Sequence, residues 1–164
     1  MKIPWSGRSH NFDKKDISFL VNIIKEADPL TQGKFLEKFE SIFSKYIGKK
    51  NVFAVSSAAA ALEIIALLAD IKKDDEVIIP AHTYCASAIP FARNGAKIIW
   101  ADINFKTRVA DLIDVKRKIT SKTKAIILVH LYGYALDFKE IISYCQKRKI
   151  KIIEDCAQAL GAEI

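Results

Sequence analysis

The sequence has few cysteines, glycines and prolines, and no long uninterrupted apolar run. Its three cysteines, Cys85, Cys145 and Cys156, are too few and too widely spaced for a disulfide scaffold or a zinc site. Six glycines and four prolines in 164 residues exclude a collagen or a disordered low-complexity chain. The longest uncharged stretch, residues 77–92, contains two prolines and a histidine, which argues against a membrane-spanning helix. We therefore expect a cytoplasmic globular protein whose reduced thiols are small buried side chains.

Positive charge is in excess but is not concentrated. Lysine and arginine total 26 against 19 acidic residues, which gives a net charge of +7. Acidic residues are mixed with the basic ones, and the densest basic run, residues 147–149, ends a predicted helix, where cations complement the helix dipole. An anionic small molecule fits this charge as well as nucleic acid does, and we predict neither a nucleic-acid nor a membrane partner.

Short apolar runs alternate with amphipathic segments along most of the chain. Hydrophobic periodicity predicts helices over residues 13–26, 34–46, 57–68, 84–93, 111–119 and 138–148, and strands over 52–55, 76–79, 97–101, 124–131 and 150–153. Strands that are apolar on both sides and alternate with helices of about 10 residues are typical of an α/β fold. We predict a mainly parallel sheet of five strands with helices on both faces.

Small residues follow the first predicted strand. Ser56 and Ser57 precede three alanines that open a helix, and backbone N–H groups at such a helix start can bind a phosphate. The alternative is an ordinary helix capped by serine. The sequence contains neither GxGxxG nor the P-loop motif, so a dinucleotide or P-loop site has little support.

Polar and aromatic residues follow three other predicted strands. Tyr84 is either a platform for a flat ring or a rim tyrosine, and His130 is more typical of a hydrogen-bonding partner than of a base. Asp155, followed by Gln158, either caps the next helix or holds a metal, a sugar hydroxyl or a protonated ring nitrogen. Ligands of open α/β sheets bind at the carboxyl ends of the strands. Together these groups suit a planar, phosphorylated cofactor that contains nitrogen.

The ordered motifs resemble the DegT/DnrJ/EryC1/StrS family of pyridoxal-phosphate-dependent nucleotide-sugar aminotransferases, from about Ile3 to Ile164. The matching segments are LTQG at 30–33, VSS at 55–57, DEVIIP at 75–80, HTY at 82–84, GAK at 95–97, TKAII at 123–127, VHLYG at 129–133 and IEDCAQALGA at 153–162. The resemblance implies a truncated large domain of the aspartate aminotransferase type (fold type I). Residues 1–33 would be an N-terminal extension and residues 34–164 an incomplete pyridoxal-phosphate-binding domain, without the C-terminal small domain.

The resemblance also implies roles for individual residues. Asp155 would pair with the pyridine nitrogen, and Gln158 would bond near the phenolic oxygen of the cofactor. Tyr84 would stack on the ring, and Ala59 and Ala60 would offer backbone N–H groups to the phosphate. A metal is not implied.

Two departures from the family pattern affect this interpretation. Ala58 and Ala59 replace the usual Gly-Thr of the phosphate turn. A left-handed alanine would cost about 1–2 kcal/mol, and the lost hydroxyl about 1 kcal/mol, so we expect weaker cofactor binding. The lysine that forms the Schiff base lies in this family after a later Ser-Phe-type strand, and we expect it downstream of Ile164. We therefore assign no catalytic residue to this chain and predict that it is inactive alone.

The family implies an enzyme that moves an amino group from glutamate to a keto-sugar nucleotide, in cell-surface polysaccharide or amino-sugar biosynthesis. Such enzymes are generally homodimers. Two alternatives remain: a non-catalytic relic or assembly module, and a variant of the sugar dehydratases that use pyridoxal phosphate without a Schiff-base lysine.

Overall fold

The computed structural model describes residues 12–29 and 31–164. The predicted family match begins at about Ile3, and its part up to Asn11 lies outside these residues. Leu30 of the LTQG motif also lies outside them. The chain divides into two compact units, one ending at Ala54 and the other running from Val55 to Ile164. Within the described residues, we find no helix of the length and apolar character needed to cross a membrane.

The first unit contains two helices. Helix α1 (Lys14–Glu26) begins at Asp13, whose carboxylate accepts the N–H groups of Lys15 and Asp16, while Asp16 bonds back to the N–H of Asp13. Helix α2 (Lys34–Ile47) ends at Gly48, which adopts the left-handed conformation that terminates helices (φ +65°). Both predicted N-terminal helices are confirmed.

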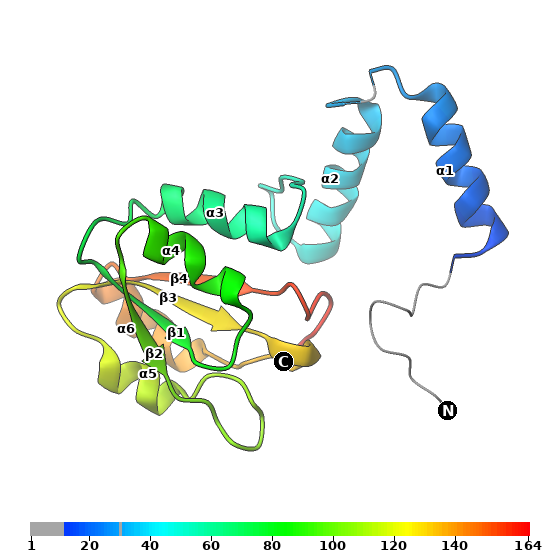
Figure 1. Ribbon diagram of the computed structural model, residues 1–164. Helices are drawn as coiled ribbons and strands as arrows, with labels where there is room; N and C mark the ends of the chain where they lie inside the picture. Colours follow the sequence, from blue (N-terminus) through cyan, green and yellow to red (C-terminus); the bar gives the residue numbers. More distant parts are fainter. Residues whose placement is uncertain (1–11, 30) are drawn as a thin grey trace. The chain divides into compact units, whose positions relative to one another are not determined.

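The second unit is a parallel α/β layer structure (Figure 1). Its elements are α3 (Ala58–Leu68), β1 (Glu76–Pro80), the 3₁₀ turn η2 (Cys85–Ser87), α4 (Ile89–Arg93), β2 (Lys97–Ala101), α5 (Leu112–Lys118), β3 (Thr123–Val129), the turn η3 (Leu131–Gly133), α6 (Lys139–Lys147) and β4 (Lys151–Asp155). The strand order is β2-β1-β3-β4, and every pairing is parallel. Helices α3 and α4 cover one face and α5 and α6 the other, as the sequence predicts.

The core lies around the two central strands. Val77, Ile78 and Ile79 of β1 are completely buried, as are residues 125–128 of β3. Phe91 of α4 and Ile141 of α6 are also completely buried. This explains why these strands read as continuous apolar runs, since parallel strands between two helical layers are covered on both faces.

Two sequence predictions about secondary structure were wrong. Residues 52–55 form no strand, because a strand needs a neighbour to pair with its N–H and C=O groups, and none of the described residues supplies one here. The described sheet thus has four strands rather than five. The predicted helix over residues 84–93 is divided into η2 and α4. Pro90, which has no N–H, occupies the first turn of α4, where that group is not needed.

The expected burial of the three thiols is correct only for Cys145. Cys85 and Cys156 are exposed. Cys145 packs in helix α6, and burial raises the pKa of its thiol, with a partly opposing effect from Arg148. The two exposed thiols both lie beyond strand ends, where the chain leaves the core.

Candidate functional site

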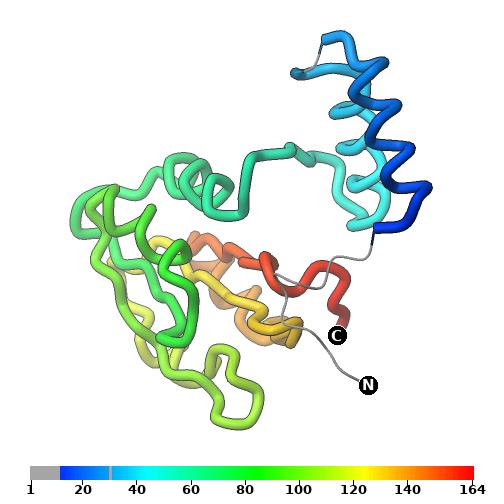
Figure 2. The backbone as a smooth tube through the Cα atoms, turned by 45° about the vertical axis from the view of Figure 1, so that its right-hand side comes forward, coloured from blue at the N-terminus to red at the C-terminus, as the bar shows by residue number. Residues whose placement is uncertain are grey.

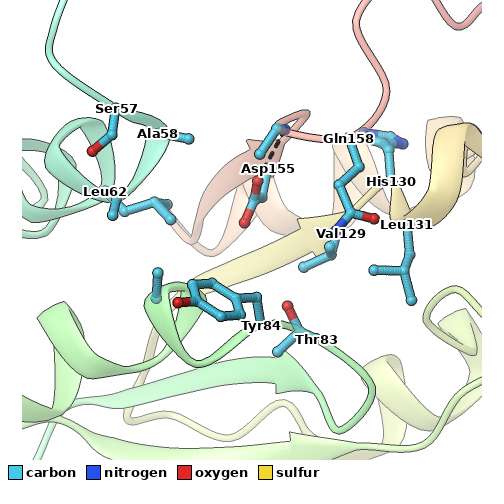
Figure 3. Close-up of a pocket in the computed structure, with 13 residues that line it drawn as sticks. Ser57, Ala58, Leu62, Thr83, Tyr84, Val129, His130, Leu131, Asp155 and Gln158 are labelled. Atoms are coloured by element: carbon cyan, nitrogen blue, oxygen red, sulfur yellow. Dashed lines mark hydrogen bonds between the residues drawn. The ribbon is translucent and has the colours of Figure 1, made fainter. Parts of the chain in front are cut away.

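A cavity of about 280 Å³ opens at the carboxyl ends of the strands. Its walls come from the start of α3, the turn after β1, the end of β3 and the segment after β4 (Figure 3). From β1 the chain crosses through α4 to β2, and from β3 it crosses through α6 to β4 on the other side and the opposite face of the sheet. The cavity therefore lies at the topological switch point between β1 and β3. Open α/β sheets bind their ligands at this point.

The start of α3 offers backbone N–H groups to this cavity. The hydroxyl of Ser57 accepts the N–H of Ala60 at 3.1 Å and caps the helix. Ala58 and Ala59 line the cavity, and their N–H groups find no partner within the described part of the chain. Neither alanine has a left-handed backbone. The strain expected for alanine in place of glycine therefore does not arise, although the missing threonine hydroxyl still removes one donor.

Asp155 is the last residue of β4, and its carboxylate is fixed from two sides. One oxygen, Oδ2, accepts the hydroxyl of Ser87 at 2.8 Å, and the other, Oδ1, accepts the N–H of Ala157 at 3.1 Å. The backbone carbonyl of Asp155 also accepts the N–H of His130 at 3.1 Å. The carboxylate is half-buried and lines the cavity, so it can meet a cationic or protonated group there.

Gln158 is oriented by the turn that follows β3. Its side-chain oxygen accepts the backbone N–H of Tyr132 at 3.0 Å, and both views of the backbone show the segment after β4 beside η3 (Figures 1 and 2). Tyr132 adopts a left-handed backbone (φ +55°), an uncommon conformation for a bulky residue that is often found at functional sites. Because the oxygen of Gln158 is engaged, its amide NH₂ remains available as a donor.

Tyr84 precedes η2 and forms the opposite wall. Its side chain is 70% exposed, and it lines the cavity beside Thr83 (Figure 3). The ring is therefore open to contact rather than packed in the core. Nearby, His82 meets the ring of Tyr132 edge-on at 5.9 Å between centroids, and its buried Nδ1 has no hydrogen-bond partner among residues 12–29 and 31–164.

His130, Glu154 and Cys156 converge, but their hydrogen bonds and the state of the thiol disfavour metal binding. Their ligand atoms lie within 4.8 Å of one another. However, Nδ1 of His130 accepts the N–H of Leu136 at 3.0 Å, so the ring proton is on Nε2, which bonds to Glu154 at 3.1 Å. Both nitrogens are thus engaged. Although Cys156 is exposed at the surface, partial desolvation of its sulfur, with the neighbouring Glu154 and Asp155 carboxylates, raises the pKa of the thiol and disfavours the thiolate that would bind a metal.

Comparison with known proteins identifies the family to which this arrangement belongs. The family model of the DegT/DnrJ/EryC1/StrS aminotransferases matches residues 11–164. The chain belongs to this family. Its aspartate aminotransferase-type fold is that of fold type I, as the resemblance implies.

Two of the similar proteins have names that specify a nucleotide sugar. The chain is 38% identical over 149 residues to the dTDP-3-amino-3,6-dideoxy-α-D-galactopyranose transaminase of Aneurinibacillus thermoaerophilus. The matched region covers 91% of this chain and 41% of the relative. It is 34% identical over 162 residues to the GDP-4-keto-6-deoxy-D-mannose 3-dehydratase of Yersinia pseudotuberculosis, covering 95% and 41%. The crystal structure of NtdA from Bacillus subtilis with the bound cofactor PMP (pyridoxamine phosphate) superposes with a TM-score of 0.83 at 34% identity, covering 91% and 35%. The chain thus spans about two fifths of the length of these family members.

The structure brings four of the five predicted cofactor residues of this DegT/DnrJ/EryC1/StrS member to one cavity. Ala59, Tyr84, Asp155 and Gln158 all line it. Ala60 does not, and its N–H is used within the helix cap. Sequence reasoning missed Ser87, which is completely buried and contacts Asp155. A serine between two alanines carries no periodic signal, so only the fold reveals this contact.

Proposed function

We propose that this cavity binds the phosphate, ring and ring substituents of pyridoxal phosphate in a nucleotide-sugar aminotransferase. The observation that carries the proposal is the fixed carboxylate of Asp155, which faces a cavity walled by Tyr84, Gln158 and the start of α3. When bound, the cofactor carries the amino group and its protonated ring withdraws electrons from the reacting carbon. The donor set fits it because the phosphate, the ring face, the ring nitrogen and the phenolic oxygen each have a complementary residue here.

The residues of this chain have separate roles toward that cofactor. The N–H groups of Ala58 and Ala59 bind the phosphate at the positive end of the α3 dipole. Asp155 holds a proton on the ring nitrogen, and the amide of Gln158 donates to the phenolic oxygen. Tyr84 covers one face of the ring and excludes water from it. Because the alanines at the phosphate turn are unstrained, their presence gives little support to the alternative of a non-catalytic relic.

The full reaction belongs to a protein longer than the described part. We propose that it transfers the amino group of glutamate to a keto-sugar nucleotide in the cytoplasm, as a homodimer. The nucleotide-sugar names of the relatives support this substrate class. Among the described residues, no lysine lines the cavity, so we expect the 164-residue polypeptide to bind cofactor without turnover.

Two measurements test this proposal. The 164-residue chain is incubated with pyridoxal phosphate, glutamate and a dTDP- or GDP-linked keto-sugar, and amino-sugar formation is followed by mass spectrometry. We expect no product, and turnover by this chain would contradict the proposed need for a lysine from elsewhere. Reading the gene past the codon for Ile164 then tests the enzyme itself. A continuing frame with a lysine after a Ser-Phe strand supports it, whereas a stop codon there favours the relic.

A second candidate is dehydration of the sugar on the same cofactor. The 34% identity to the Yersinia pseudotuberculosis dehydratase favours it, because this similarity is close to that of the transaminase. The two candidates differ at the position of the expected lysine, which the dehydratase variant would lack. A continuing frame without that lysine, with loss of water from the keto-sugar and no amino-sugar product, would select the dehydratase.

A further inference from the structure

A completely buried serine lies directly behind the site. Ser87 is 0% exposed, and its hydroxyl donates to Oδ2 of Asp155 at 2.8 Å, although the two residues are 68 positions apart in the sequence. The hydroxyl of Ser87 also lies 2.8 Å from the hydroxyl of Thr83. Buried polar groups are expensive unless they are hydrogen-bonded, so this chain of contacts needs a physical explanation.

The direction of the hydrogen bonds follows from the chemistry of the groups. An ionised carboxylate only accepts, so the single hydroxyl proton of Ser87 is directed to Asp155. The contact between Thr83 and Ser87 must then use the proton of Thr83. The order is therefore Thr83 to Ser87 to Asp155, with each hydroxyl donating in the direction of the Asp155 carboxylate.

The same turn also carries the aromatic wall of the site. Tyr84 precedes η2, and its carbonyl accepts the N–H of Ser87 at 3.0 Å. Thr83, Tyr84 and Ser87 are thus held in one short segment between β1 and α4. The bond from Ser87 ties this segment to the end of β4, so it sets where the Asp155 carboxylate lies relative to the Tyr84 ring.

We propose that Ser87 and Thr83 form a two-hydroxyl relay that positions the carboxylate of Asp155 toward the ring nitrogen of the cofactor. The proposal rests on the proposed cofactor site. Both residues are positioning residues, since they act through Asp155. The relay leaves the second oxygen, Oδ1, bonded to the N–H of Ala157, so the carboxylate is held at both ends, and no lysine or arginine among the described residues pairs with it.

The test uses the 164-residue chain and pyridoxamine phosphate, which binds without a Schiff base. Dissociation constants are measured by fluorescence titration for pyridoxamine phosphate and for its 1-deaza analogue, in which CH replaces the ring nitrogen. We expect Ser87→Ala to weaken pyridoxamine phosphate binding roughly 5- to 20-fold and Thr83→Val roughly threefold. Neither variant should change the affinity of the deaza analogue, because that ring offers Asp155 no N–H.

Two variants serve as matched controls. Thr83→Ser keeps the hydroxyl that Thr83→Val removes, and it should bind pyridoxamine phosphate like the wild type. Thr123→Val removes a buried hydroxyl at the opposite end of the sheet, where it accepts the N–H of Thr120 at 2.9 Å. It should lower the urea midpoint of unfolding without changing pyridoxamine phosphate affinity. If Ser87→Ala weakens both ligands equally, or neither, the positioning role is wrong.

A ligand-free measurement separates failure of the relay from failure of the cofactor site. The carbon-13 resonance of the Asp155 carboxyl is recorded at pH 7 for the same variants. A shift of this resonance in Ser87→Ala and Thr83→Val, but not in Thr83→Ser, supports the relay whether or not the wild type binds pyridoxamine phosphate. A wild type that binds no pyridoxamine phosphate would overturn the proposed function rather than the relay. An unchanged resonance in both hydroxyl-deletion variants overturns the relay whatever the wild type binds.

Discussion

The side-chain oxygen of Gln158 accepts the backbone N–H of Tyr132 at 3.0 Å. This bond orients the amide, so that its NH₂ is the part left to donate to a ligand. Gln158→Glu keeps an acceptor for Tyr132 but removes the donor and adds a negative charge beside the phenolic oxygen. We expect pyridoxamine phosphate affinity to fall about 10-fold, from one lost charge-assisted bond, as measured by fluorescence titration.

Tyr132→Phe is the matched control for this prediction. It alters the exposed side chain of Tyr132 but leaves the backbone N–H that orients Gln158. Its affinity should equal that of the wild type. Equal affinity in Gln158→Glu would show that the amide does not donate to the ligand.

His130 joins three segments of the second unit. It bonds through Nδ1 to Leu136, through Nε2 to Glu154 and through its backbone N–H to Asp155. His130→Ala leaves the buried N–H of Leu136 without a partner and creates a cavity, so we expect a loss of about 2–3 kcal/mol in the free energy of unfolding. Urea denaturation measures this loss.

His130→Asn separates the two causes of that loss. The asparagine oxygen lies near the position of Nδ1 and can still accept the N–H of Leu136, whereas the bond to Glu154 is lost. We expect it to recover about half of the stability lost in the alanine variant. An asparagine variant as unstable as the alanine variant would argue that packing, rather than the bond to Leu136, determines the role of His130.

The lowered pKa of Asp114 predicts that this residue contributes to the free energy of unfolding in an acid-sensitive way. Its carboxylate is 5% exposed, and bonds from Lys118, from the N–H of Asp102 and from Arg117 lower its pKa from 3.8 to about 2, against an opposing effect of burial. Because the folded-state pKa is below the unfolded one, the stabilisation is present above pH 4. It is lost as the pH falls from about 4 to about 2.

The pH dependence can be measured against Asp114→Asn, which keeps an acceptor for Asp102 but has no charge. We expect the wild type to be more stable by on the order of 1–2 kcal/mol at pH 7, since the Arg117 partner is solvent-screened. The difference should shrink below pH 4 in urea titrations. A difference that stays constant down to pH 2 would contradict the ionic origin of this contribution.

Much of the fold follows from the sequence because its signals are local. The strand over residues 97–101 is found with the predicted bounds, and Ser57 and Asp111 cap α3 and α5 as their positions before apolar runs suggest. Residues 52–55 show where this reasoning fails. Their composition favours a strand, but a strand forms only when a second segment supplies a paired backbone, which local composition does not report.

The candidate site was predictable where a residue type marks a strand end. Asp155, Gln158 and Tyr84 were singled out as polar or aromatic groups near strand ends, their cofactor roles came from the family resemblance, and all three line the cavity. Ser87 was not found, since its importance comes from a contact with a residue 68 positions away. The orientation of Gln158 likewise depends on the left-handed backbone of Tyr132, and no residue pattern in the sequence predicts that conformation.

The most direct test of the cofactor site is the affinity of the 164-residue chain for pyridoxamine phosphate before and after Asp155→Ala. We predict that the wild type binds and that the variant binds at least about 10-fold more weakly, because it loses a charged hydrogen bond. Asp111→Ala, which removes a carboxylate that caps α5, should bind like the wild type. No binding by the folded wild type, or equal binding by Asp155→Ala, would contradict the assignment of this cavity as the cofactor site.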